Sequence, residues 1–281
     1  MNRALKVAAS QPWQLDLTGG VQAPVDSSCV GIAEALEPEQ LLDLAVDSKL
    51  NHVCQKSGHL FDEDIQSANC MIENDESYFK FPVSTILAPQ SVSVESEKSL
   101  LMLNAQFSSS AEKQSVLGNL TSLLVSKGIA KTVLDDVVAV ADEFYTNAIF
   151  NAPFVDMNTH NNPGISRNSL DIKLQDGKQA RLFLAQDAKR LVIGCEDPFG
   201  SLDLTRYLTK VRSTYQKGPG AAINFGPGGA GIGSYIIFNA GSSLYFGVWP
   251  GRATLLCCVI PLGMSNRKRI LLSKHIHWIQ R

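Results

Sequence analysis

The spacing of hydrophobic and polar positions is most regular after about residue 106. Apolar residues at helical spacing predict a helix that begins at a capping box formed by Ser109 and Glu112, and a second helix over residues 131–152. Shorter apolar runs bounded by turn residues predict the remaining elements of this region. In chain order these are strands over residues 169–174, 180–186 and 190–196, a helix over residues 202–215, a helix after the glycine run that ends at Ser234, and strands over residues 244–249 and 252–261.

The connections between these strands indicate the fold class. Asp176-Gly177, Asp187-Ala188 and Pro250-Gly251 are turn pairs that join consecutive strands as hairpins. Hairpins with few crossovers predict a mixed, mainly antiparallel sheet. We therefore expect an α+β fold, a two-layer α/β sandwich with the helices on one face of the sheet.

The chain divides into three parts in this interpretation. Residues 1–104 form a small acidic N-terminal module, in which Pro38 marks the start of a short helix and alternation predicts strands over residues 78–83 and 91–95. Residues 105–265 form the main domain. Residues 266–281 form a basic tail, which we expect to be a helix packed on its own domain, with docking on a partner or a membrane surface as the alternative.

Composition narrows the class of protein. The chain has 281 residues, of which 44% are hydrophobic and 19% charged, as in soluble globular proteins. No apolar run reaches the ~18–20 residues of a membrane span, and the N-terminus has no signal-peptide core, so we expect a cytoplasmic protein. The net charge of −2 is unevenly distributed, because ten basic residues and no acidic residue follow Asp203. This basic part favours anionic ligands or partners.

The cysteines show no disulfide framework, and we expect all six to be reduced. Cys257 and Cys258 are neighbours in an apolar strand, so their side chains should point to opposite faces of the sheet. A mixed group of His and Cys residues near the N-terminus has a spacing that matches no common zinc pattern, so no zinc site is expected there: His52, Cys54, His59 and Cys70.

The run from Gly226 to Ser234 contains five glycines and precedes an apolar helix. Backbone N–H groups at such a helix start bind phosphate. A P-loop is excluded because no Lys-Ser/Thr pair follows the glycines. A dinucleotide fingerprint is excluded because it requires an acidic residue about 20 positions later, and none exists after Asp203.

Two segments before the glycine run carry further candidate chemistry. Glu143, Asn147 and Asn151 are four residues apart, so they form one polar stripe on the predicted helix over residues 131–152. An amide oxygen is a suitable ligand for Mg²⁺, and a carboxylate one turn away can accept a proton from an attacking hydroxyl. Asp197, at the end of an apolar strand and followed by Gly200, is placed to accept a hydrogen bond from an adenine amino group.

These three segments, in this order, resemble the N, G1 and G2 boxes of the Bergerat-fold (GHKL) ATPases, the superfamily of gyrase, chaperone, histidine-kinase and MutL ATPases. The short helical start of this region and the E-x-x-x-N-A form of the first box are closest to the anti-sigma-factor serine/threonine kinases. The residues that match the family's ATP site are Glu143 as general base, Asn147 as Mg²⁺ ligand, Asn151 where the family usually has His, Asp197 and Gly200 at the adenine, and Gly229, Gly231 and Gly233 in the phosphate loop.

The resemblance implies a bacterial regulatory protein that binds ATP and Mg²⁺ and phosphorylates a Ser or Thr of an antagonist protein. Its partner is then that antagonist or a sigma-factor-like regulator, with a second copy of the chain as a further candidate, and it does not bind nucleic acid directly. The segment Asp197-Pro-Phe-Gly200 departs from the family's D-x-G-x-G pattern, as Asn151 departs from His. These departures favour a catalytically weak or inactive binding module as the alternative. A histidine-kinase ATPase domain is a third hypothesis.

Overall fold

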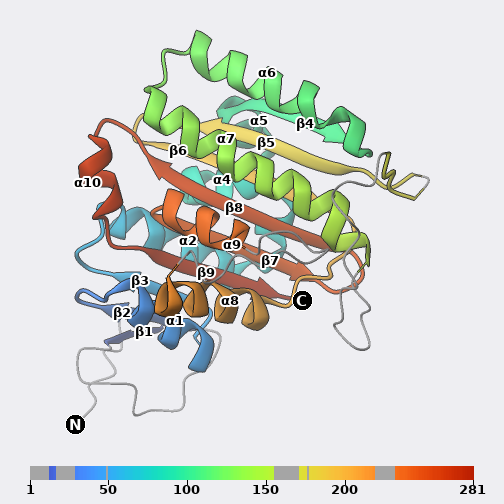
Figure 1. Cartoon of the computed structure of the whole chain (residues 1–281). Helices are drawn as coiled ribbons and strands as arrows, with labels where there is room; N and C mark the ends of the chain where they lie inside the picture. The colour runs from blue at the N-terminus through green and yellow to red at the C-terminus, as the bar shows by residue number, and fades with distance from the viewer. Residues whose placement is uncertain (1–12, 17–28, 49, 155–170, 176, 219–231) are drawn as a thin grey trace.

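The computed structural model describes residues 13–16, 29–48, 50–154, 171–175, 177–218 and 232–281. The strands in this part of the chain are β1 Trp13–Asp16, β2 Cys29–Ala33, β3 His52–Gln55, β4 Leu101–Phe107, β5 Ala180–Gln186, β6 Arg190–Asp197, β7 Ser243–Trp249, β8 Ala253–Pro261 and β9 His275–Gln280. They form one sheet in the order β1-β2-β3-β9-β7-β8-β6-β5-β4 (Figure 1). The sheet is mixed, because β1, β2 and β3 are parallel, β7 and β9 are parallel, and the other neighbours are antiparallel.

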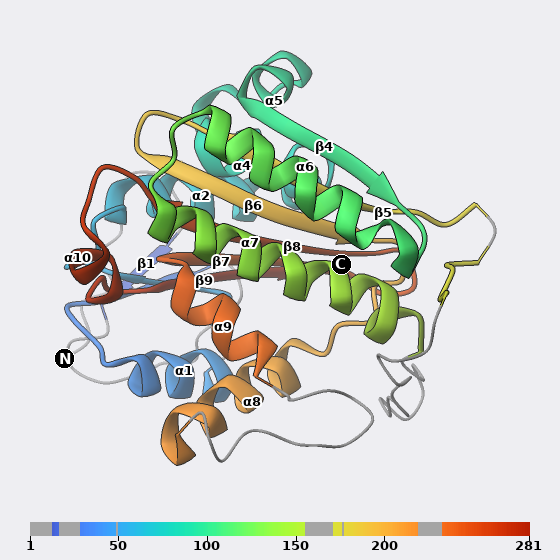
Figure 2. The ribbon, with the colours of Figure 1, turned by 45° about the horizontal axis from the view of Figure 1, so that its top comes forward.

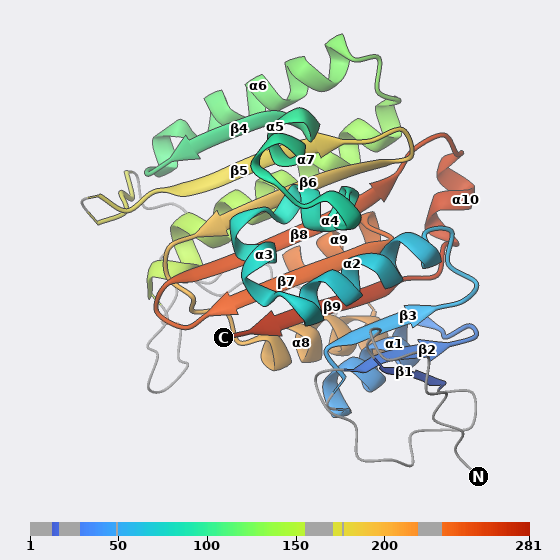
Figure 3. The same ribbon diagram turned by 180° about the vertical axis from the view of Figure 1, so that it is seen from behind.

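Helices cover both faces of this sheet. The α-helices are α1 Pro38–Asp47, α2 Phe61–Glu73, α3 Asp75–Lys80, α4 Pro82–Leu87, α5 Val94–Leu100, α6 Lys113–Ser126, α7 Lys131–Thr146, α8 Leu204–Lys217, α9 Gly233–Ala240 and α10 Asn266–Ile270. Helices α1, α6, α7, α8 and α9 lie on one face (Figure 2). Helices α2 to α5 lie on the other (Figure 3). The expectation of helices on one face is correct for α6 to α9 and wrong for the whole chain, which has three layers.

A separate apolar core fills each side of the sheet. On the α7 side, Val137, Val140 and Phe144 are among the buried residues that pack on the sheet. On the other side, Met71 and Tyr78 pack against the opposite face of the strands. Adjacent residues of β8 enter different cores, Cys258 the first and Cys257 the second, which confirms the prediction that they point to opposite faces. All six cysteines are free thiols.

The main domain matches its predicted elements closely. The Ser109–Glu112 capping box is present and starts a short 3₁₀ turn that leads into α6. The β5–β6 and β7–β8 hairpins are confirmed. The strand predicted over residues 169–174 is wrong within the described residues 171–175, where Lys173 makes only an isolated bridge with Ser109. The Asp176-Gly177 turn falls partly outside the described residues.

Two strand predictions in the N-terminal part are wrong, because both segments are helical. The Asn74 side chain accepts from the Ser77 N–H at the start of α3, and the Ser93 side chain accepts from the Ser96 N–H at the start of α5. Pro82 occupies the first turn of α4, where its missing N–H costs nothing. These helix starts favour helices over the strands that the short apolar alternation predicts. The next strand along the chain is β4.

The prediction of a helical tail is also wrong. Residues 266–281 contain the short helix α10 and the strand β9, which lies between β3 and β7 inside the sheet. Consecutive residues of a strand point to opposite faces of the sheet. Because His275, Ile276 and His277 are each at most 1% exposed, both faces of β9 are buried. The division of the chain at residues 104 and 265 stays a prediction, and the structure adds that strands from all three parts belong to one sheet.

Arg190 links the sheet to the helices on its α2 side. Its buried guanidinium pairs with Asp187 at 2.6 Å and donates to the carbonyls of Ile86 and Leu87 at 3.1 Å each, which joins the β5–β6 hairpin to α4. Nearby, Lys189 forms a solvent-exposed pair with Glu63.

We expect Arg190→Ala to lower the free energy of unfolding by about 2–4 kcal/mol, because Asp187 Oδ2 and the Leu87 carbonyl lose a buried donor and the Ile86 carbonyl keeps only the Ser67 hydroxyl. Lys189→Ala is the matched control and should change stability far less, since exposed ion pairs contribute little. Urea unfolding monitored by circular dichroism measures both. Equal effects of the two substitutions would contradict this role of Arg190.

Candidate nucleotide-binding site

The polar stripe of the sequence analysis lies at the C-terminal end of α7. The helix continues after Thr146 as a π-helical turn, Asn147–Asn151, a form often found at functional sites. The side chains of Asn147 and Asn151 meet there, since Asn151 Nδ2 donates to Asn147 Oδ1 at 2.6 Å. Glu143, one turn earlier, is buried with 9% of its surface exposed.

Glu143 lies against the backbone at the start of α9. A methyl group added to Gly233 would lie 2.0 Å from Glu143 Oε2, so a side chain at this position would displace the Glu143 carboxylate. The first N–H groups of a helix and its dipole favour negative charge, which suits a carboxylate or a phosphate at this point. The structure therefore brings together Glu143 and Gly233, two of the residues that the sequence assigned to one site.

Two hydroxyls that the sequence reasoning missed are buried near this helix start. Ser234 Oγ and Tyr207 Oη have no hydrogen-bond partner among the described residues. Burial raises the pKa of Tyr207 well above its usual range, and the nearby Cys258 and Glu143 raise it further. Both hydroxyls stay protonated and are available as donors to an anionic group.

Asp197 lies at the C-terminal end of β6, where it is 8% exposed. Its carboxylate accepts from the Phe199 N–H at 3.0 Å. Thr254, a residue with no sequence motif, lies directly opposite Asp197 in the β6–β8 register and is buried beside it. Burial raises the pKa of Asp197 to about 7, although the backbone N–H groups of Phe199 and Gly200 oppose this shift.

Gly200 shapes the turn after Asp197. Its φ of +60° is in the left-handed region, and an added methyl group would lie 2.0 Å from the Trp249 carbonyl oxygen. The next residue, Ser201, donates its hydroxyl to the Ala152 carbonyl at 3.0 Å. This bond joins the turn after β6 to the segment that follows the π-helical turn. The ends of α7 and β6 are thus held side by side.

Gly229 and Gly231 lie outside the described residues. Arg212 of α8 pairs with Asp43 and Asp47 of α1 at 3.1 Å and 3.0 Å. No helix in the described ranges is both long and apolar enough to cross a membrane.

Comparisons with known proteins place the chain only loosely. No protein-family model matches the sequence, and the search of curated proteins finds no match. Among solved structures, it is similar to a chain in the crystal structure of the SiaB-SiaC complex from Pseudomonas aeruginosa, with 15% sequence identity and a TM-score of 0.39. The alignment covers 68% of this chain and 96% of the other.

The raised pKa of Asp197 predicts a pH-dependent stability. The folded chain keeps this proton up to about pH 7, whereas an unfolded Asp releases it near pH ~3.9, so wild-type stability should fall as pH rises between these values. Asp197→Asn removes the titrating carboxyl and, with it, this contribution to the pH dependence of stability. We expect its free energy of unfolding to gain about 1–3 kcal/mol relative to wild type between pH 5 and pH 8.

Chemical denaturation of both proteins at pH 5, 6, 7 and 8 measures the difference. Parallel stability profiles for the two proteins would contradict the assignment of a buried, readily protonated carboxyl at this position. Asp203→Asn, at the exposed N-cap of α8, is a control for a carboxylate that accepts from the Arg206 N–H.

Proposed function

We propose that this chain is an ATP-binding regulatory protein that resembles the anti-sigma-factor serine/threonine kinases and phosphorylates a Ser or Thr of an antagonist protein. The observation that carries the proposal is the contact of the Glu143 carboxylate with the backbone of Gly233. It places a candidate proton acceptor at a helix start suited to phosphate. A Bergerat-type arrangement of helix, strand end and glycine loop is part of the same proposal.

The residues fit the two ends of a nucleotide. Asp197 and Thr254 offer a buried acceptor and a hydroxyl at the end of β6 and β8 for the amino edge of adenine. The start of α9, with the Ser234 and Tyr207 hydroxyls nearby, offers donors for phosphate oxygens. Asn147 would hold Mg²⁺, which neutralises phosphate charge during transfer.

Glu143 has the role of general base in this proposal. The substrate hydroxyl oxygen bonds to the γ-phosphorus, the bond from that phosphorus to the bridging oxygen of ADP breaks, and Glu143 accepts the hydroxyl proton. Since phosphoryl transfer depends mainly on positioning and electrostatics, the rigid placement of Glu143 against α9 is the main contribution of the fold.

A second candidate function is a binding module that signals by conformation without phosphoryl transfer. The hydrogen bond from Asn151 Nδ2 to Asn147 Oδ1 favours it, because the oxygen needed for Mg²⁺ already accepts a donor. The Asn151 amide then competes with a metal ion for the lone pairs of Asn147 Oδ1. In this function the nucleotide, or a protein partner alone, shifts the conformation of the loop and α9.

The first test concerns binding. We expect Mg·ATP to raise the melting temperature of the full chain, and Asn147→Ala to reduce affinity at least tenfold by removing an oxygen that holds the metal. Asn104→Ala, an exposed residue of the edge strand β4, is the matched control and should bind like wild type. Isothermal titration calorimetry measures affinity. No binding of Mg·ATP by folded wild-type protein would leave only a partner-binding function.

The second test separates the two candidate functions. Glu143→Gln keeps the size of the side chain and removes the proton acceptor, so we expect ATP affinity to persist while phosphoryl transfer falls by about 10²-fold or more. Transfer of labelled phosphate to candidate antagonist proteins is the readout. If wild type binds Mg·ATP but transfers nothing, the binding module is the correct function.

A further inference from the structure

A second polar cluster lies on the other face of the sheet, away from α7. It is built by neighbouring strands β3, β9 and β7. The register pairs His52 with His277 across β3 and β9, and pairs Ser243 with His275 and Tyr245 with His277 across β7 and β9. Side chains two residues apart on a strand share a face, so Cys54 joins the same array next to His52. Three neighbouring strands thus present two rows of polar side chains within the sheet.

Helix α2 covers this array and adds a carboxylate. Asp64 is 1% exposed, and its oxygens accept from the Ser243 hydroxyl at 2.8 Å and from the Tyr245 hydroxyl. The backbone at Gly58 packs closely against the His275 ring, since a methyl group added to Gly58 would lie 2.0 Å from His275 Nε2. The cluster is therefore closed to solvent on the α2 side.

Several buried ring nitrogens of the cluster make no hydrogen bond, although Asp64 lies close to two of them. His52, His275 and His277 are each at most 1% exposed. His52 Nε2, both ring nitrogens of His275 and His277 Nε2 have no hydrogen-bond partner among the described residues. Burying an unpaired polar group costs about 1–3 kcal/mol, so this many at one place indicates a missing ligand.

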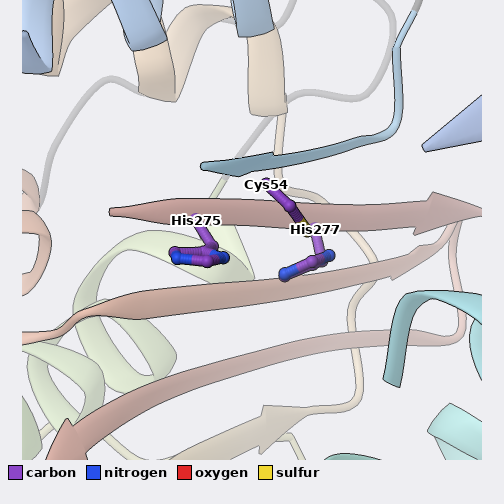
Figure 4. Close-up of side chains that lie close together, drawn as sticks. All are labelled: Cys54, His275 and His277. Carbon is purple, nitrogen blue, oxygen red and sulfur yellow. The ribbon is translucent and has the colours of Figure 1, made fainter. Parts of the chain in front are cut away.

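The side chains converge as the ligands of one metal ion do. Cys54, His275 and His277 each offer a ligand atom, and these atoms lie within 4.8 Å of one another (Figure 4). The Asp64 oxygens are 3.3 Å from His275 Nδ1 and 3.6 Å from His277 Nε2. Bonds of ~2.0–2.3 Å in a tetrahedral zinc site place neighbouring ligand atoms about 3.3–3.8 Å apart.

We propose that Cys54, His275 and His277 bind a structural Zn²⁺ ion, with Asp64, whose oxygens lie beside His275 Nδ1 and His277 Nε2, as the fourth ligand. A thiolate with imidazoles selects zinc over Mg²⁺ or Ca²⁺, which prefer oxygen ligands. The charges of one thiolate and one carboxylate balance a divalent cation, as a fully buried site requires. His52, whose Nδ1 is 3.3 Å from His277 Nδ1, orients that ligand from outside.

The ion would join distant parts of the chain. Cys54 belongs to β3, the histidines belong to β9, and Asp64 belongs to α2, so one ion fixes a strand pair and its covering helix. The cluster faces α2, whereas the candidate nucleotide site lies on the α7 side of the sheet. The zinc proposal is thus independent of ATP binding, and either can fail without the other.

The first experiment measures metal in the full-length protein purified without chelator. We expect elemental mass spectrometry to find about one equivalent of zinc per chain. After zinc removal, Co²⁺ should give the intense visible bands of a tetrahedral site and a near-ultraviolet sulfur-to-cobalt band. A folded wild-type protein that contains no zinc, and binds neither added Zn²⁺ nor Co²⁺, overturns the proposal.

Substitutions locate the site, and the chain supplies matched controls. Cys54→Ser and His275→Gln should each lower zinc affinity by at least tenfold. Cys70→Ser and His59→Gln change the same residue types outside the cluster and should keep full zinc content. Wild-type zinc affinity in Cys54→Ser, or zinc loss in both controls, contradicts the assignment.

If a cluster variant does not fold, wild-type protein still decides the question. Chelation should lower its melting temperature, and added Zn²⁺ should restore it, because an ion that binds only the folded chain stabilises it. Unchanged melting with and without zinc would overturn a structural role for the ion.

Discussion

The pairing of β9 with β3 on one side and β7 on the other is the constraint on which this fold depends. It closes the sheet between the strands of the N-terminal part and those of the main domain. Without this pairing each apolar core would lose part of its packing, since Ile276 belongs to the core under α7 and Ile279 to the core under α2. A single strand thereby serves both faces of the molecule.

That arrangement separates two kinds of polar chemistry. On the α7 face, polar groups gather where helix and strand ends meet, at Glu143, Gly233 and Asp197. On the α2 face, His275 and His277 lie at the start of β9, buried under a covering helix. The proposed nucleotide site thus lies at the ends of secondary-structure elements, whereas the proposed zinc site lies under a covering helix.

The sequence predicted most of the main domain, because its signals are local. The capping box at Ser109, the apolar stripe of α7 and the turn residues of the β5–β6 hairpin each act within a few positions. The same local rules misjudged residues 75–100, where the helix caps at Asn74 and Ser93 outweighed alternation. They also missed β9, whose apolar and basic mixture resembles a surface tail until its two partner strands are known.

The candidate site divides in the same way. A family pattern predicted Glu143 and Gly233 as parts of one site, and the structure places them in contact, while their chemical roles stay a prediction. Thr254 and Tyr207 could not be found from motifs, because only the register and the packing of α8 bring them near. Cys54 lies near His59 and Cys70 in the sequence, whereas its neighbours in the structure, His275 and His277, are more than two hundred positions away.

The distance between these strands along the chain has a consequence for synthesis. His52 and His277 are separated by 225 positions, so a ribosome completes β3 long before it completes β9. Until then β3 presents an unpaired edge, and an unpaired edge is a template for pairing with another chain. The nascent protein therefore passes through a vulnerable period that ends only when β9 emerges, and chaperones that shield exposed strands would act in this interval.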